Sequence, residues 1–131
     1  MNASSPAPHS AASSFTIAPV AGYLGAEISG LDLSKPISGT LGQPLRKALA
    51  DHLVLFFRDQ KLGLSDLKRM TAVFGPLLRI PYVEPSPEDP DVVAVLKEAD
   101  ETKISVFGGD WHSDFSFLEK PPAGSLLYGA E

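Results

Sequence analysis

The unbroken apolar run at residues 53–57 (Leu-Val-Leu-Phe-Phe) constrains the fold more than any other segment of the chain. A run of five residues is too short to form a helix on its own, and it predicts a buried central β-strand. Arg58, Asp59 and Gln60 end this strand with polar side chains. The chain is therefore expected to build a sheet around it, because an interior strand needs a neighbour on each side.

Helical periodicity occurs on both sides of the predicted strand. Before it, apolar side chains recur at positions 41, 45, 48, 49 and 53, and residues 40–43 have the T-x-x-Q form of a capping box, so residues 41–52 predict an amphipathic helix. After it, Ser65 is a suitable N-cap for a second helix. Leu67, Met70 and Phe74 share one face of that helix, and Gly75-Pro76 ends it.

Further short strands are predicted along the chain, and the resulting fold class is α+β, mainly β with flanking helices. The predicted strands are residues 15–20, 26–33, 91–97, 104–107 and 124–130. Residues 80–90 hold four prolines and predict an irregular loop. Residues 125–128 (Ser-Leu-Leu-Tyr) have the character of an interior strand although the sequence ends three residues later, as if a sheet were cut in the middle.

Composition and charge exclude several classes of protein. The 131 residues are 44% hydrophobic, which suits one small domain with a core, and the net charge of −5 argues against a nucleic-acid partner. No apolar run approaches the ~20 residues of a membrane helix, so no membrane association is expected. The absence of cysteine excludes disulfides and zinc–thiolate sites and fits a cytoplasmic location. Residues 1–14, rich in Ser, Ala and Pro, predict a disordered tail in which His9 is solvated.

The motif that carries chemistry is the pair His112 and Asp114, within residues 108–117 (GGDWHSDFSF). On an extended strand, residues two apart point to the same face, so this imidazole and this carboxylate could bind one metal ion. Together they form two-thirds of the 2-His-1-carboxylate facial triad of non-haem Fe(II) oxygenases, whose third ligand must come from elsewhere. A structural hydrogen bond between the two side chains, at the end of a strand, is the alternative.

The residues around this pair have both a structural and a functional interpretation. Asp110 and Trp111 are candidates for supporting His112 without touching the metal, although Asp110 also suits a solvated turn. Trp111, Phe115 and Phe117 are either core residues or the wall of a pocket that keeps water from a reactive iron.

Other polar residues carry weaker signals. Arg79 could meet an anionic substrate or simply lie in solvent, and His52 at the end of the first helix favours a dipole interaction over metal ligation. The sequence contains neither the G-x-G-x-x-G of dinucleotide-binding folds nor the G-x-S-x-G of serine hydrolases.

Four blocks of the sequence occur in an order shared with one known family. They are residues 25–33 (GAEISGLDL), 53–60 (LVLFFRDQ), 74–77 (FGPL) and 111–114 (WHSD), continued by Phe117 and by residues 121–124 (PPAG). In this order the chain, from about residue 15 to residue 131, resembles the TauD/TfdA-like dioxygenases, the Fe(II)- and 2-oxoglutarate-dependent oxygenases related to taurine catabolism.

The resemblance implies a fold, a reaction and a set of ligands. Residues 15–131 would be the N-terminal portion of a double-stranded β-helix (jelly roll), with His112 and Asp114 as two of the three ligands of Fe(II). The reaction would be decarboxylation of 2-oxoglutarate by O₂ coupled to hydroxylation of a small organic substrate. The distal His, and the Arg and Thr that hold 2-oxoglutarate, follow the metal motif in the family. The seventeen residues after Asp114 contain neither His nor Arg, so the chain is expected to be a fragment, inactive alone and without 2-oxoglutarate-binding residues of its own.

Two departures from the taurine-specific branch bear on the substrate. Ile80 stands where that branch has a His, and Gly108 stands where it has an Asn, so both polar contacts to taurine are lost. A pocket lined by Ile80, Tyr82, Gly108 and Phe115 would suit an alkyl sulfonate, an alkyl sulfate or an aryloxy acid.

Two other functional classes remain open from the sequence. One is a non-catalytic, shortened relative that acts as an interaction module through an exposed sheet edge. The other is a cupin-like metal protein that completes its site from another subunit. For the dioxygenase the expected partner is a small molecule, and the full-length protein could be a homo-oligomer.

Overall fold

The computed structural model describes residues 14–96 and 110–130. The chain divides into two compact units, Met1–Phe74 and Gly75–Glu131, and each is described by itself. The sequence predictions for His9, for Gly108 and for a strand at residues 104–107 lie outside the described residues.

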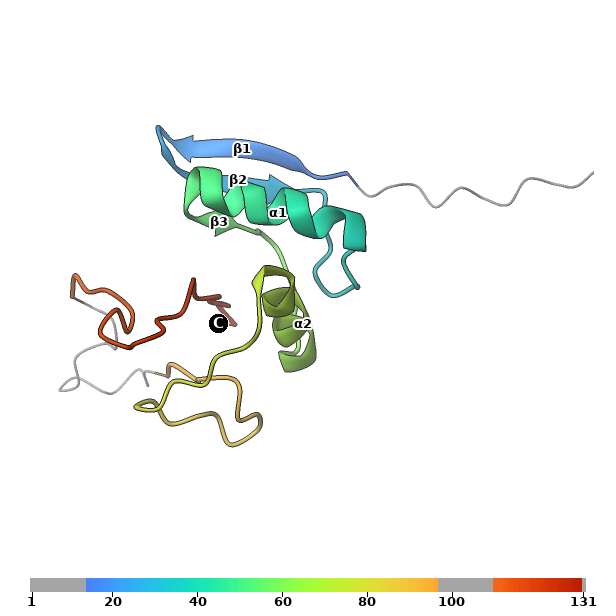
Figure 1. The fold of residues 1–131 in the computed structure, drawn as a ribbon. Helices are drawn as coiled ribbons and strands as arrows, with labels where there is room; N and C mark the ends of the chain where they lie inside the picture. Colours follow the sequence, from blue (N-terminus) through green and yellow to red (C-terminus); the bar gives the residue numbers. More distant parts are fainter. Residues whose placement is uncertain (1–13, 97–109, 131) are drawn as a thin grey trace, which may run out of the picture. The chain divides into compact units, whose positions relative to one another are not determined.

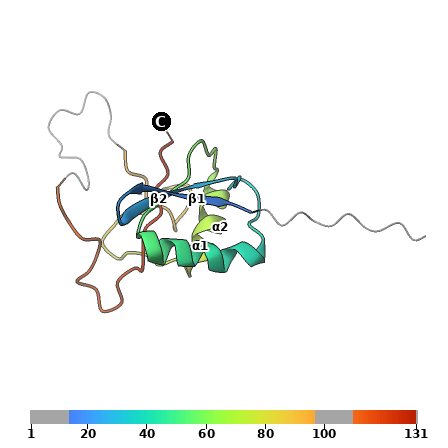
Figure 2. The same cartoon turned by 90° about the horizontal axis from the view of Figure 1, so that it is seen from above.

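The first unit is built on a three-stranded sheet in the order β1-β2-β3 (Figure 1). Strands β1 (Thr16–Ala21) and β2 (Leu24–Ser29) form an antiparallel hairpin, and Gly22 adopts a positive φ of 44° at its turn. Strand β3 (Leu55–Phe56) pairs with β2 in parallel. Helix α1 (Gly39–His52) makes the crossover that a parallel pair requires, and it lies along one face of the sheet (Figure 2).

The core of this unit lies between α1, α2 (Leu64–Phe74) and one face of β2. Alternate residues of β2 are buried on that face, as the period of a strand requires. The fully or almost fully buried apolar side chains are Ala26, Ile28, Leu33, Leu45, Ala48 and Met70. The helical spacing predicted from the sequence thus selects the correct face of each helix.

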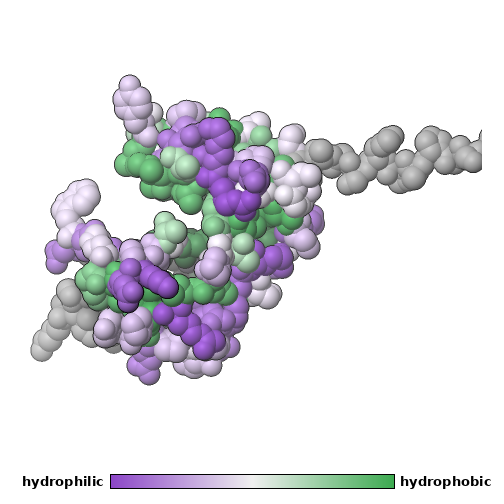
Figure 3. Space-filling view, viewed as in Figure 1, coloured by the Kyte–Doolittle hydropathy of each residue, from purple (hydrophilic) through white to green (hydrophobic). Residues whose placement is uncertain are grey.

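Hydrophobic surface remains exposed on the β1–β2 hairpin, where Figure 3 shows it in green. All six residues of β1 are exposed, and Ile17, Val20 and Leu24 have exposed fractions of 43%, 54% and 55%. The apolar composition of this segment is therefore only partly used by the packing of the first unit.

The prediction of a buried central strand at residues 53–57 is wrong in extent and in burial. Only Leu55–Phe56 is strand, and it lies at an edge of the three-stranded sheet. Leu53 is the C-cap of α1 in a left-handed conformation with φ 65°, and its side chain is 67% exposed. The apolar run is thus divided between a helix end and a short edge strand.

The two helices occupy the predicted segments but begin differently. Helix α1 starts at Gly39 after Ser38, so the capping box predicted at residues 40–43 is wrong, and the Ser38 hydroxyl contacts the Thr40 hydroxyl at 2.9 Å instead of capping. Helix α2 begins at Leu64, one residue before the predicted N-cap. Its first turn is closed by Asp66, whose carboxylate accepts the Gly63 N–H at 3.0 Å. The helix ends at Phe74, before Gly75-Pro76, as predicted.

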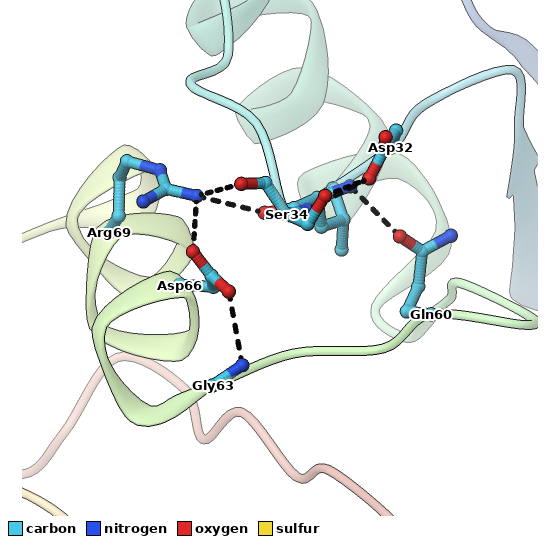
Figure 4. A network of polar contacts seen from close by, with 7 residues as sticks. Asp32, Ser34, Gln60, Gly63, Asp66 and Arg69 are labelled. Carbon is cyan, nitrogen blue, oxygen red and sulfur yellow. Dashed lines mark hydrogen bonds and ion pairs between the residues drawn. The ribbon is translucent and has the colours of Figure 1, made fainter.

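A polar network joins the segment after β2 to α2 and to the segment after β3 (Figure 4). The guanidinium of Arg69 donates to the carbonyl oxygens of Leu33 at 3.2 Å and Ser34 at 2.8 Å, and to the carboxylate of Asp66 at 2.7 Å. The side chain of Gln60 accepts the Leu33 N–H at 2.9 Å. Main-chain groups that lie outside helix and strand are satisfied in this way.

The second unit contains no helix or strand among residues 75–96 and 110–130. An isolated bridge between Ser86 and Asp89 lies inside the loop predicted at residues 80–90. The strands predicted at 91–97, as far as residue 96, and at 124–130 do not form. Val95, Leu96 and Leu127 are 53%, 81% and 88% exposed, because no neighbouring strand covers them in the described part of the chain.

The described residues thus form a small sheet with two helices, as expected for an α+β protein. Within residues 14–96 and 110–130, neither helix has the length and apolar character needed to cross a membrane.

Candidate metal-binding site

The side chains of His112 and Asp114 meet in the second unit. The imidazole Nε2 of His112 lies 3.2 Å from the carboxylate Oδ1 of Asp114, and each side chain is 49% exposed. The backbone here bends and does not form a strand, so the expectation of an extended segment is wrong. The bend nevertheless brings the two predicted side chains together.

The other ring nitrogen of His112 is held by the main chain. Its Nδ1 lies 2.6 Å from the carbonyl oxygen of Asp110, and a carbonyl can only accept, so Nδ1 carries the proton. This hydrogen bond raises the pKa of His112 above its ordinary value; desolvation partly opposes the shift, and the charge of Asp114 and a hydrogen bond with its carboxylate reinforce it. In the neutral ring Nε2 then keeps its lone pair, which is the form that binds a metal. Asp110 acts on His112 chiefly through its main-chain carbonyl, and the charge of its side chain is a smaller contribution.

The carboxylate of Asp114 also has a contact on its far side. The hydroxyl of Ser125 donates to Asp114 Oδ2 at 3.1 Å. Phe115, the next residue, adopts a positive φ of 50°, which is costly for a residue with a bulky side chain. A turn follows, in which the Leu118 N–H donates to the Phe115 carbonyl at 3.0 Å. The Asp114 side chain is thus placed by a strained turn and by a hydroxyl from eleven residues further on.

The side chains of His112 and Asp114 provide some, but not all, of the ligands that an octahedral divalent cation needs. One imidazole nitrogen and one carboxylate oxygen converge, which are two of the three ligands of a facial triad. Among residues 14–96 and 110–130, no group of three or more His, Asp or Glu side chains could hold a metal ion. His52, in the last turn of α1, occupies the position expected for a helix-dipole interaction. The residues present therefore fit iron as two ligands of an incomplete site.

An aromatic cluster follows the metal pair. The rings of Tyr82 and Phe117 have centroids 6.0 Å apart, and those of Phe115 and Phe117 are 6.2 Å apart. Tyr82 and Phe117 are 73% and 72% exposed, so the interpretation of Phe117 as a core residue is wrong. Trp111 is fully exposed and is not a core residue either. Large aromatic groups lie at the surface here because residues 75–96 and 110–130 form no helix or strand that packs against them.

Two further residues singled out from the sequence have ordinary surroundings. Arg79 forms an ion pair with Asp91, with Nε 2.7 Å from Oδ1, and its side chain is 68% exposed. Ile80 is half-buried, and Gly108 lies outside the described residues. The ion pair of Arg79 and the contact of Ser125 were missed by the sequence analysis, because each joins residues at least eleven positions apart with no periodic signal.

Comparison with known proteins identifies the relatives of this chain. The taurine catabolism dioxygenase TauD, TfdA family matches residues 16–131. An alkylsulfatase of Acinetobacter baylyi is 34% identical over 109 residues, which are 82% of this chain and 33% of that protein. An alpha-ketoglutarate-dependent sulfate ester dioxygenase of Pseudomonas putida is 34% identical over 121 residues, which are 92% of this chain and 38% of that protein.

Solved structures agree with these relatives. A taurine dioxygenase from Burkholderia xenovorans aligns with a TM-score of 0.55 and 30% identity over 63% of this chain and 31% of that chain. A putative alpha-ketoglutarate-dependent taurine dioxygenase from the same organism aligns with a TM-score of 0.54 and 30% identity over 59% of this chain and 28% of that chain. The chain spans between 28% and 38% of the length of these relatives and solved structures.

Proposed function

The chain belongs to the taurine catabolism dioxygenase TauD, TfdA family, and from that membership we propose that the protein is an Fe(II)- and 2-oxoglutarate-dependent dioxygenase. It hydroxylates a small organic substrate with O₂. The observation that carries this proposal is the 3.2 Å approach of His112 Nε2 and Asp114 Oδ1 inside the segment that matches the family.

In this proposal His112 and Asp114 are metal ligands with separate tasks. His112 would supply Nε2 to the metal, because its Nδ1 proton is held by the carbonyl of Asp110. Asp114 supplies one anionic oxygen on the same side. A facial set of ligands would leave open positions on iron for the keto acid and O₂, and the metal would supply the chemistry of O₂ activation when bound.

The third ligand and the 2-oxoglutarate site are proposed to come from polypeptide outside this sequence. The resemblance implies a distal His and an Arg downstream of Asp114, and residues 115–131 contain neither. The curated relatives are roughly three times as long as the matched segment. The jelly roll implied by the family would then be completed by the same missing part, and the chain alone would bind iron weakly and turn over nothing. A cytoplasmic location and a homo-oligomeric state stay predictions.

The proposed substrates are alkyl sulfates, alkyl sulfonates or aryloxy acids. Tyr82, Phe115 and Phe117 offer an apolar aromatic surface that begins at the residue after Asp114. Ile80 and Gly108 lack the polar groups that the taurine-specific branch uses. The names of two relatives, an alkylsulfatase and a sulfate ester dioxygenase, support the sulfate class.

Iron binding tests the site directly. Anaerobic titration of the 131-residue chain with Fe(II) is expected to show weak binding at one ion per chain, lost in His112→Ala and in Asp114→Ala. His52→Ala is the matched control, because it removes a histidine outside the proposed site, and it is expected to bind as the unsubstituted chain does. Binding that survives both site variants, or that is lost equally in the control, would contradict the proposal.

Turnover tests the reaction and its substrate. Succinate formation that depends on Fe(II) and 2-oxoglutarate is expected only when the chain is joined to a segment carrying a distal His and Arg. Succinate formation by the purified 131-residue chain alone would contradict the proposal that its metal site is incomplete. With the completed protein, longer alkyl sulfates are expected to react faster than taurine, and the opposite order would overturn the substrate assignment.

A further inference from the structure

The two proposed metal ligands share an arrangement in which the far atom of each is held by a second group. The Nδ1 of His112 is bonded to the Asp110 carbonyl at 2.6 Å, and the Oδ2 of Asp114 accepts the Ser125 hydroxyl at 3.1 Å. The two remaining atoms, Nε2 and Oδ1, are the ones that face each other at 3.2 Å. Each side chain thus has one atom held from behind and one atom in contact with the other side chain, and a bound metal would take the place of that contact.

From this geometry we propose that Ser125 is a positioning residue for the carboxylate of Asp114, and the inference rests on the metal site proposed above. Rotation of a carboxylate about its last side-chain bond is soft, so the torsion alone does not choose which oxygen faces the metal. A hydroxyl that holds Oδ2 fixes this choice and leaves Oδ1 to bind. Removing a group that hydrogen-bonds a metal ligand without touching the metal typically lowers metal affinity by about 10–100-fold.

The same contact sets how many metal positions Asp114 occupies. With Oδ2 engaged by Ser125, the carboxylate binds through Oδ1 alone. A carboxylate free of that hydrogen bond can also bind through both oxygens and occupy a second position. Because a facial site needs its remaining positions for the keto acid and O₂, one-oxygen binding keeps the site usable. Ser125 thus contributes to the openness of the site as well as to its affinity.

The neighbouring serines do not share this role. The hydroxyls of Ser113 and Ser116 lie 2.8 Å apart and bond to each other. Ser125 comes from a segment eleven residues after Asp114 and is exposed, so its loss removes a contact without opening a buried cavity. Ser116→Ala therefore provides a matched control: the same change, in the same unit, at a hydroxyl that bonds to Ser113 and to neither ligand.

Manganese provides a probe that does not depend on turnover. Mn(II) prefers oxygen and nitrogen ligands in octahedral geometry, and its paramagnetism broadens the NMR signals of nearby nuclei even when binding is weak. The full 131-residue chain is titrated with Mn(II) alone, and the broadening of the His112 and Asp114 signals gives an affinity for each variant. Ser125→Ala is expected to weaken Mn(II) binding by about tenfold. Ser125→Thr, which keeps the hydroxyl, and Ser116→Ala are expected to stay within about twofold of the unsubstituted chain.

The outcomes separate this inference from the proposed function. Equal affinities in Ser125→Ala and the unsubstituted chain would overturn the role of Ser125 and leave the metal site standing. A loss in Ser116→Ala as large as that in Ser125→Ala would also overturn it, because a general disturbance of the loop would then be the cause. If the unsubstituted chain shows no selective broadening at residues 112 and 114, the metal site itself is wrong and this inference falls with it. The metal-free spectra of all variants, with unchanged dispersion, confirm that each is folded.

Discussion

Arg69, on helix α2, donates a hydrogen bond to the main-chain carbonyl of Ser34 at 2.8 Å, thirty-five residues earlier in the chain. The same guanidinium nitrogen reaches the carbonyl of Leu33 at 3.2 Å and the carboxylate of Asp66 at 2.7 Å. One side chain therefore connects the segment after β2 to the first turn of α2. Because Leu33 is buried, its carbonyl has little access to water and depends on this donor.

Arg69→Lys is expected to destabilise the first unit by about 1–2 kcal/mol, because a lysine side chain ends one bond short of the terminal guanidinium nitrogen that reaches two carbonyls and a carboxylate. Urea denaturation followed by circular dichroism measures the change. Lys47→Ala is the control, since the Lys47–Asp51 pair is largely exposed, and it should cost less than ~0.5 kcal/mol. Equal stability of Arg69→Lys and the unsubstituted chain would mean that the network does not hold the segment.

Gln60 makes a second set of contacts to the same segment. Its Oε1 accepts the Leu33 N–H at 2.9 Å, and its Nε2 donates to the carbonyls of Leu31 at 3.2 Å and Arg58 at 2.9 Å. Gln60→Glu replaces the donor by an anionic oxygen that would face two carbonyls. We expect a loss of about 2 kcal/mol, measured by the same denaturation.

The control for Gln60 is Gln43→Glu, an identical change on the exposed face of α1. A carboxylate near a helix N-terminus is neutral to slightly stabilising, so no loss is expected there. A cost in Gln43→Glu equal to that in Gln60→Glu would show that added negative charge, and not the lost hydrogen bonds, is responsible.

The sequence was sufficient to predict elements whose packing partners are local. Apolar spacing identified α1 and α2 because one face of each helix is buried against neighbouring segments of the first unit, as Leu45 and Met70 show. The end of α2 at Gly75-Pro76 follows from the chain chemistry alone. The exact helix starts were less predictable, because each start has two polar residues that could cap it. These are Ser38 and Thr40 for α1, and Ser65 and Asp66 for α2.

Strands were harder to predict from the sequence than helices, because a strand forms only when another strand pairs with it. The apolar segments at 91–96 and 124–130 have strand composition, yet they lack partners among the described residues and remain irregular. The pair His112 and Asp114 was predicted from its spacing on a strand, but a bend and a positive φ at Phe115 bring it together. The contact of Ser125 depends on this tertiary arrangement and leaves no trace in local sequence.

Leu53 offers a stabilising substitution. It occupies the left-handed C-cap of α1 with φ 65°, where a Cβ atom is unfavourable, and its side chain is 67% exposed. Leu53→Gly is expected to raise the free energy of unfolding by up to about 1 kcal/mol, measured by urea denaturation. Leu53→Ala keeps the Cβ atom while removing the exposed side chain, so it should bring no gain. A gain as large in Leu53→Ala would show that exposed apolar area, and not backbone strain, was relieved.

The ionisation of Asp32 makes the stability of the first unit depend on pH in acid. Hydrogen bonds from Ser34 and the ion pair with Lys35 at 2.9 Å lower the pKa of Asp32 to about 2, from an ordinary value of 3.8. A carboxyl group with a lower pKa in the folded state stabilises that state when ionised. The contribution is therefore complete above about pH 3.8, declines as the pH falls toward about 2, and is absent below that value. The pKa of Asp66 is lowered in the same direction, first by the Gly63 N–H and then by Arg69.

Asp32→Asn isolates this contribution, because asparagine keeps an oxygen that can accept from Ser34 but does not ionise. Near neutral pH the variant should be less stable than the unsubstituted chain, and the two should converge at about pH 2. Urea denaturation at a series of pH values, compared between the two proteins, measures the convergence. A stability difference that stays constant across this range would mean that Asp32 acts through packing or hydrogen bonding alone, since only the ionised carboxylate can make the difference depend on pH.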